Sequence, residues 1–372
     1  MGSALRILQA GELCLNEPLY GISGDLPPNL QTSIINARFL AAKKLFSAAM
    51  TESVHLVVLA GKFCLPNQET RPYWFLQEQF QRLKNHGIQV VCVEPTNHFH
   101  WPSTIPLPEN VHIFSRSQST SSLVINGSKP IELQWASPAS NQSSPQPHHC
   151  VLRLSESMGR VSKISYQGNN NQGFTQISLT PIQRGALDEA RPAHATLVEV
   201  DSSSGVSHST VETEVVQFSR VNLEVAANQS KSQLQQQLIE QFKRSEEELH
   251  RRAQPTLVSL SLTIKDHENT KFSNFEISEL LSFMQNDAQA RQSHCWPVRL
   301  LVPKQESETT SHSNNTPVQI ALGELESLAL DDVYENLDLQ VLDIDQHSLE
   351  RLKEKVAQRL PELLTEHRQN SA

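Results

Sequence analysis

The stretch LRILQAGELCL, at residues 5–15, is an apolar run that ends in a short loop. Two later stretches have the same form: VHLVVLAGKFCLP at 54–66 and IQVVCVEPTNH at 88–98. Helical patterns of apolar residues separate them, at 31–50 and 71–86. Strands that alternate with helices predict βαβ units and a parallel sheet. The loops after these strands would then meet at one edge of the sheet, where α/β proteins form their sites.

The three loops carry short motifs with polar side chains. They are Glu12-Leu13-Cys14 after the first run, Gly61-Lys62-Phe63-Cys64-Leu65 after the second, and Thr96-Asn97-His98-Phe99 after the third. The segments that frame these motifs are Pro18-Leu19-Tyr20-Gly21, Leu65-Pro66 and Tyr73-Trp74-Phe75-Leu76-Gln77-Glu78-Gln79-Phe80. In the order of its motifs and in their framing, the chain resembles the SbcD-type DNA-repair exonucleases of the calcineurin-like metallophosphoesterases.

This resemblance implies both a fold and a chemistry. The fold is α/β: a calcineurin-like metallophosphoesterase four-layer sandwich, truncated in its second half, with a small C-terminal α/β capping domain. In the family, the first strand ends in Asp-x-His, the second in Gly-Asp-x-x-Asp, and the third in Gly-Asn-His followed by Asp or Glu. These side chains hold two metal ions, which activate water and neutralise the phosphate.

The chain departs from this ligand pattern. Lys62 stands at the position of the bridging Asp, and a protonated lysine repels divalent ions and cannot bind them. Leu65 and Phe99 replace two further carboxylates. Most of the metal ligands of the family are therefore lost, and we expect a degenerate site.

The resemblance leaves four candidate site residues. They are Glu12, Cys14 and Asn97 as metal ligands, and His98 as the general acid toward the leaving oxygen. Glu12 keeps the charge of the first motif, whereas Cys14 would bind a metal only as a thiolate, which favours zinc over manganese. We expect no cofactor; if a metal is bound, we expect manganese or zinc.

Alternatives remain open for these side chains. In one, Cys14, Cys64, His98 and His100 form a single tetrahedral zinc site, although the paired-cysteine spacing of such sites is missing. In the other, the two cysteines are small buried apolar residues and His98 is hydrogen-bonded within a loop. Lys62 is either a solvated loop lysine or a phosphate anchor.

The second half of the chain keeps less of the family pattern. A strand at 111–116 and a hairpin at 122–136 precede a polar linker at 137–149, SPASNQSSPQPHH. Residues 178–201 again resemble the family, in the stretch that leads into its last strand. Residues 154–159 (LSESMG) lie where the family has a Gly-x-His ligand motif, and they contain no histidine.

We place a domain boundary near residue 226. Residues 1–225 form the nuclease-like domain, whose second sheet would be completed by strands at 193–201 and 211–225. Residues 226–372 form the capping and partner-binding region. Its expected elements are a helix at 230–252, a strand at 255–265, a helix at 275–290, a strand at 296–303 and a helix at 347–368. An acidic, leucine-rich segment at 320–345 suits packing against the cap or docking of a partner.

Charge and composition narrow the function classes. The net charge of −9 argues against a broad DNA-binding face, because duplex affinity comes chiefly from Lys and Arg. Five cysteines without paired spacing predict reduced thiols and a cytoplasmic location. The sequence has no signal-peptide pattern and no apolar run near the roughly 20 residues of a membrane helix. We expect a soluble cytoplasmic protein with no membrane contact.

Three hypotheses for the function result. The first is a catalytically inactive SbcD-like homologue that binds DNA ends or repair partners. The second is a residual metal-dependent phosphodiesterase or DNA exonuclease, and the third is a structural scaffold subunit. Through the resemblance, the expected partners are DNA ends, an SbcC-like coiled-coil ATPase and a second copy of the chain.

Overall fold

The computed structural model describes residues 4–302 with several gaps. The gaps are 23–25, 65–68, 95–100, 116–117, 119, 126–130, 136–149, 158–159, 169–173, 188, 190, 202–204, 227–229, 250–253 and 266–273. By compactness the chain divides into residues 1–304 and 305–372, and the elements below belong to the first unit. The helix expected at 347–368, the leucine-rich segment 320–345 and the linker 137–149 lie outside the described residues.

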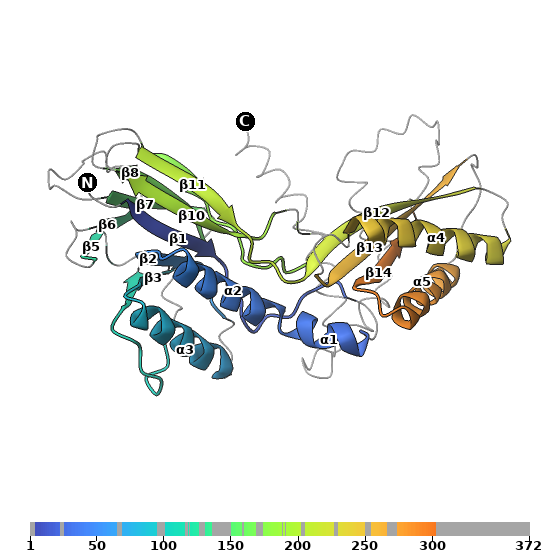
Figure 1. Ribbon diagram of the computed structural model, residues 1–372, viewed down its shortest axis with the longest axis horizontal. Helices are drawn as coiled ribbons and strands as arrows, with labels where there is room; N and C mark the ends of the chain where they lie inside the picture. The colour runs from blue at the N-terminus through green and yellow to red at the C-terminus, as the bar shows by residue number, and fades with distance from the viewer. Residues whose placement is uncertain are drawn as a thin grey trace, which may run out of the picture. The chain divides into compact units, whose positions relative to one another are not determined.

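A six-stranded sheet forms the first layer (Figure 1). Its strands, in spatial order, are β11 (Gly205–Val211), β10 (Ala195–Asp201), β1 (Leu5–Gly11), β2 (Leu56–Ala60), β3 (Gln89–Glu94) and β4 (Val111–Ser115). The pairs from β1 to β4 are parallel, and β10 and β11 are added antiparallel. This confirms the parallel strand order expected from the first three apolar runs.

Both faces of the centre of this sheet are covered, which explains why a central strand such as β2 is apolar throughout. Leu8 and Val57 face a core that also contains Phe46 and Phe80, from helices α2 (Ala37–Thr51) and α3 (Arg71–Asn85). The two phenyl rings meet edge to face, with centroids 5.9 Å apart. Alternate residues such as Ile7 face the other way, into a second core.

The helix expected over 31–50 is two helices. Helix α1 (Pro28–Ile35) ends at Asn36, and α2 begins at the next residue. The Asn36 side chain donates a hydrogen bond to the carbonyl oxygen of Thr32 at 2.9 Å, a local bond that competes with continuation of the helix. Helix α3 agrees closely with the helix expected at 71–86.

A five-stranded sheet packs against the second face. Its strands, in order, are β5 (Thr120–Leu123), β6 (Ile131–Trp135), β7 (Cys150–Ser157), β8 (Arg160–Gly168) and β9 (Thr175–Ser178). The β5–β6 pair is antiparallel, as expected for the hairpin at 122–136. Leu152, Ile164 and Tyr166 of this sheet share a core with Ile7 and Val58 of the first.

The prediction of which strands complete the second sheet is wrong. We expected strands at 193–201 and 211–225 to finish it, whereas β10 pairs with β1 in the first sheet. The second of these stretches contains β12 (Gln217–Ala226), which joins a third sheet. The strands that do complete the second sheet, β7 to β9, lie in a polar region that the apolar-run criterion passes over.

The third sheet is a parallel βαβαβ unit. It contains β12, β13 (Thr256–Lys265) and β14 (Cys295–Leu301), with α4 (Lys231–Leu249) and α5 (Asn274–Ala290) between them in sequence. Helix α4 buries Leu234, Leu238 and Phe242 at helical spacing. Together with the first two sheets, this confirms a mixed α/β protein. The boundary near residue 226 stays a prediction.

None of the described helices combines the length and the apolar character needed to cross a bilayer.

The two facing sheets share a buried hydrogen bond that suggests a stability test. The Tyr166 hydroxyl donates to Gln9 Oε1 at 2.5 Å, and both side chains are almost fully buried. Tyr166→Phe leaves that oxygen without its donor, so we expect a loss of about 1 to 3 kcal/mol in the free energy of unfolding, measured in urea. Tyr20→Phe is the control, because Tyr20 is 53% exposed. Equal stability of the two variants would contradict this account.

Candidate functional site

The loops after β1 and β2 run side by side at the edge predicted to hold the site. The amide of Glu12 donates to the carbonyl of Ala60 at 2.9 Å, and the amide of Cys14 donates to the carbonyl of Lys62 at 3.0 Å. These bonds extend the β1–β2 pairing beyond the ends of the two strands. The structure therefore brings Glu12, Cys14 and Lys62 together, as the parallel strand order predicted.

The backbone of these loops is constrained. Glu12 and Cys14 have φ angles of 36° and 47°, a region that side chains other than glycine seldom adopt. Gly61 has a φ angle of 87°, and a Cβ atom there would lie 3.2 Å from Cγ of Glu12. Strained backbone of this kind is kept only where the surrounding contacts hold it in place.

Glu17, in the loop after β1, is the centre of an ion-pair network. Lys62 Nζ contacts Glu17 Oε1 directly, and Arg38 Nη2 lies 3.8 Å from Glu17 Oε2. The side chains of Arg38 and Glu17 are only 7% and 12% exposed. The hydrogen bond to Glu17 raises the pKa of Lys62 above its ordinary value. Lys62 is therefore a cation that forms an ion pair with Glu17. It is not simply a solvated loop lysine.

A second set of charges comes from the segment between β9 and β10. Arg191 Nη2 lies 3.1 Å from Glu189 Oε1 and 3.9 Å from Glu12 Oε2. The other oxygen of Glu189 accepts a hydrogen bond from the Gly185 amide at 2.8 Å. A Cβ atom at Gly185 would lie 2.7 Å from Arg38 Nη2. A larger residue at position 185 would therefore displace the end of the Arg38 side chain.

The charges of this strand-end cluster balance one another. Its carboxylates are Glu12, Glu17 and Glu189, and its cations are Arg38, Lys62 and Arg191. A two-metal centre requires a surplus of anionic ligands around the ions, and here each carboxylate is in contact with a cation. Among the described residues, no group of three or more His, Cys, Asp or Glu side chains is arranged to hold a metal ion. These residues do not fit a two-metal site.

Cys14 is a buried thiol beside the strand-end charges. Its side chain is buried, and burial raises its pKa to about 12. Burial also raises the pKa of Cys64, whose thiol is hydrogen-bonded to Tyr73. Since zinc binds the thiolate form, the structure favours the interpretation of Cys14 as a small buried apolar residue. Asn97, His98 and His100 lie outside the described residues.

The sequence analysis missed Glu17, Arg38 and Arg191. Arg38 offered a signal, because it lies on the same helical face as the buried Ala41, Ala42 and Leu45. A charged residue within an apolar stripe requires a buried partner. The sequence could not identify Glu17 as that partner, because the contact depends on the path of the loop after β1.

Comparisons with known proteins do not assign the chain to a family. No protein-family model matches the chain, and no curated protein matches it.

The buried ion pair leads to a stability prediction. Glu17→Gln keeps the shape of the side chain but leaves Arg38 buried without its counter-charge, so we expect a loss of about 3 to 5 kcal/mol in the free energy of unfolding. The matched control is Glu109→Gln, because Glu109 pairs with Lys84 where its side chain is 87% exposed. We expect that change to cost less than about 1 kcal/mol. Similar unfolding midpoints in urea for both variants would refute a buried network.

Thiol reactivity tests the environment of Cys14. In the folded protein at pH 8, we expect Cys64 to react with a thiol-specific reagent before Cys14 and Cys150, because only Cys64 is partly exposed. Burial raises the pKa of both slower thiols to about 12, so the thiolate fraction is very small at that pH. Mass spectrometry of peptides from timed samples gives the order. Early labelling of Cys14 would overturn this assignment and reopen the zinc hypothesis.

Proposed function

We propose that this chain is a non-hydrolytic homologue of the SbcD-type nucleases, built on a calcineurin-like metallophosphoesterase scaffold, and that it acts by binding DNA ends or repair partners. The observation that carries the proposal is the contact of Lys62 with Glu17 at the edge where β1 and β2 end. In the family that the motifs resemble, this position holds the carboxylate that bridges two metals. Here it holds a cation with a raised pKa.

The charges around Lys62 support a metal-free site. Lys62 lies where a bridging carboxylate would attract two metal ions, and its charge is instead satisfied by Glu17, so the position supplies no net attraction for a divalent ion. Arg38 contacts the same carboxylate, so Glu17 is already shared between two cations. The two carboxylates best placed to attract a metal, Glu12 and Glu17, are already in contact with cations.

The arrangement of layers is compatible with the proposed scaffold. Two facing sheets share one core, helices α2 and α3 cover the first sheet, and a small parallel βαβαβ unit follows in the chain. The order of these parts agrees with a nuclease-like domain followed by a cap. The second sheet carries β7 to β9, in place of the histidine-bearing segments expected of an active family member.

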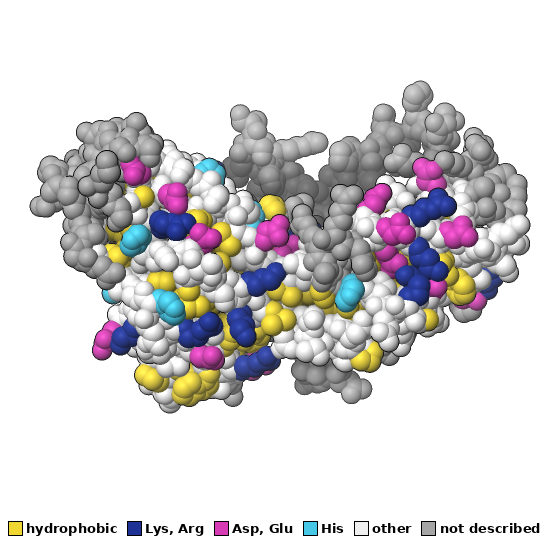
Figure 2. Space-filling view, in the orientation of Figure 1, with side chains coloured by type: hydrophobic (Ala, Val, Ile, Leu, Met, Phe, Trp, Pro, Cys, Tyr) yellow, Lys and Arg dark blue, Asp and Glu magenta, His cyan; other side chains and the backbone are white. Residues whose placement is uncertain are grey.

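The charge distribution limits how DNA would be bound. On the face shown in Figure 2, Lys and Arg side chains lie among Asp and Glu side chains over the sheets and helices. With a net charge of −9, long stretches of duplex are a poor ligand. Binding to ends, or through a protein partner such as a coiled-coil ATPase or a second copy of the chain, requires a smaller favourable surface.

Metal binding tests the proposal first. Titration calorimetry of the metal-stripped protein with Mn²⁺ and Zn²⁺ should show no stoichiometric binding, and the protein should not degrade linear duplex DNA with either ion present. Lys62→Asp replaces the cation with a carboxylate, so we expect it to raise the affinity for Mn²⁺. Stoichiometric binding by the natural chain, weakened by His98→Ala, would instead support the residual phosphodiesterase.

DNA binding is tested separately. Fluorescence anisotropy with an end-labelled linear duplex, competed by unlabelled linear or covalently closed circular DNA, measures the preference for ends. The proposal expects the linear competitor to be the more effective one, with an affinity that falls as salt is raised. If no DNA is bound, the structural scaffold hypothesis is favoured, and light scattering of the purified chain then reports whether it forms dimers.

A further inference from the structure

Strand β11 is the outermost strand of the six-stranded sheet (Figure 1). Its outer side is a lateral edge of the sheet, as distinct from the edge at which the strands end. All seven residues of β11 pair with β10, from Gly205 opposite Asp201 to Val211 opposite Ala195, without a register shift. In such a strand every second residue directs its N–H and C=O groups outward. Among the described residues, only those of β10 form hydrogen bonds with this backbone.

The lateral edges of the third sheet are both protected. On β12, side chains of α4 bind the backbone: Gln237 Nε2 donates to the Glu224 carbonyl at 3.0 Å, and the Glu224 amide donates to Gln241 Oε1 at 2.9 Å. On β14, Pro297 has no N–H to donate, and the β13–β14 register shifts beside it. Covering by a helix, proline and β-bulges are all features that keep a sheet edge from pairing with another chain.

The remaining lateral edges are short or covered. Strands β5 and β9, at the two edges of the five-stranded sheet, have four residues each. Strand β4 has five residues, and Trp135 Nε1 donates to the carbonyl of its last residue, Ser115, at 3.1 Å. Of the six lateral edges of the described sheets, β11 is therefore the longest one without a protecting feature.

The side chains of β11 favour pairing with an identical strand. Its sequence, GVSHSTV, contains no proline and no Lys, Arg, Asp or Glu. Ser207, His208, Ser209 and Thr210 are all exposed, so both faces of the strand are open at its centre. An uncharged strand offers nothing that would select a charged peptide. Two copies of a chain with a net charge of −9 can meet there without like charges directly opposite one another.

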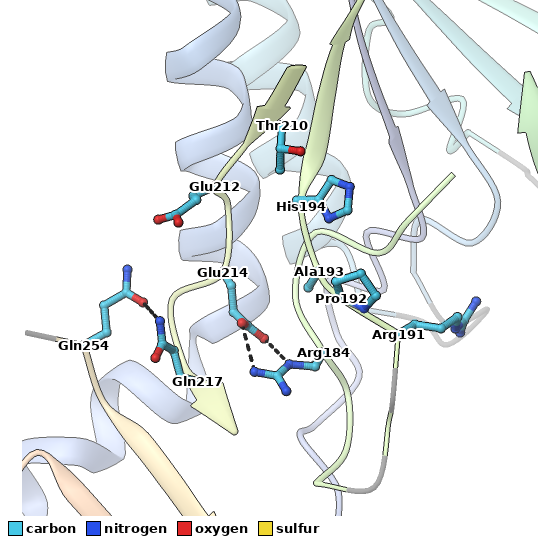
Figure 3. A pocket seen from close by; sticks show the side chains of 10 residues that line it. All are labelled: Arg184, Arg191, Pro192, Ala193, His194, Thr210, Glu212, Glu214, Gln217 and Gln254. Carbon is cyan, nitrogen blue, oxygen red and sulfur yellow. Dashed lines mark hydrogen bonds and ion pairs between the residues drawn. The ribbon is translucent and has the colours of Figure 1, made fainter. Parts of the chain in front are cut away.

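Charged side chains follow directly after β11. Thr210 and Glu212 line a pocket with a volume of about 380 Å³ (Figure 3). Its walls also include Arg191 of the strand-end cluster and the amide groups of Gln217 and Gln254, which are hydrogen-bonded to each other at 3.0 Å. The uncharged stretch of the lateral edge therefore ends with β11 itself on this side.

We propose that β11 pairs with β11 of a second copy of this chain. An antiparallel pair of identical strands has a two-fold axis, so each copy presents the same surface to the other, as in most homodimers. The register in which all seven residues pair places the axis at His208, and Ser207 then lies opposite the partner's Ser209. The two six-stranded sheets become one continuous sheet. The inference goes beyond the proposed function, because it names a contact surface and requires neither DNA binding nor the absence of a metal.

Sedimentation equilibrium of the whole chain over a range of concentrations tests the proposal. One strand pair buries less than the roughly 1,200 Å² of a stable interface, so we expect a reversible monomer–dimer equilibrium. His208→Lys places two like charges opposite one another at the axis and should weaken dimerisation by about tenfold or more. Asn286→Lys adds the same charge at an exposed position of α5 and should leave the dissociation constant unchanged. Thermal unfolding confirms that both variants are folded.

Disulfide trapping locates the interface. Directly opposite residues of an antiparallel pair have Cα atoms about 4.5 to 5.5 Å apart, a distance that a disulfide spans. His208→Cys should therefore give a covalent dimer with oxidised glutathione as the oxidant. Thr210→Cys is the matched control, because its two copies would lie about 13 Å apart along the strands. The natural chain, in which four of the five cysteines are buried, gives the background.

Three results would overturn the proposal. They are a natural chain that stays monomeric at every concentration, a His208→Lys variant that dimerises as tightly as the natural chain, and a His208→Cys variant that cross-links no more than Thr210→Cys. Neither measurement involves DNA or a metal ion. Failure here leaves the DNA-end and metal-binding assays unaffected, so it is distinct from failure of the proposed function.

Discussion

The carboxylate of Glu17, held between Lys62 and the buried Arg38, is the constraint on which the strand-end cluster depends. A guanidinium that is only 7% exposed must have a counter-charge, because an unpaired buried ion costs several kcal/mol. Glu17, in the loop after β1, supplies that counter-charge and also contacts Lys62, and the backbone of Gly185 passes close to the end of the Arg38 side chain. The edge that would hold metal ions in a phosphoesterase is therefore occupied by a self-neutralising set of protein charges.

The same loops connect the cluster to the rest of the molecule. Backbone hydrogen bonds from Glu12 and Cys14 continue the β1–β2 pairing, and the two sheets behind them share a core that contains Ile7 and Tyr166. The segment that supplies Glu189 also leads into β10, the antiparallel neighbour of β1. Arg191 in turn joins the cluster to the neighbouring pocket. The cluster is thus joined to the first sheet by backbone hydrogen bonds and by the segment that leads into β10.

Sequence patterns were most informative where burial on both faces produced continuous apolar runs. Strands β1 to β3, helix α3 and the elements from α4 to β14 all lie within a few residues of their expected positions. The patterns failed at β7 to β9, because strands with polar residues on one face give weak signals. They also failed for β10, since a single strand does not reveal which sheet it joins. The sequence patterns identified Glu12 and Cys14 as candidate site residues, but they did not identify Glu17 and Arg38.

By itself, the sequence determined the α/β class, the edge at which the loops of β1 and β2 meet, and the presence of a lysine, Lys62, in the loop after β2. These features depend on local periodicity and on residue identity. The tertiary structure alone decided that Lys62 pairs with Glu17, that Arg38 is buried against them, and that Gln217 and Gln254 form one wall of a pocket. Such contacts join residues far apart in the chain, and their geometry is set by the packing of sheets and loops, which no local pattern records.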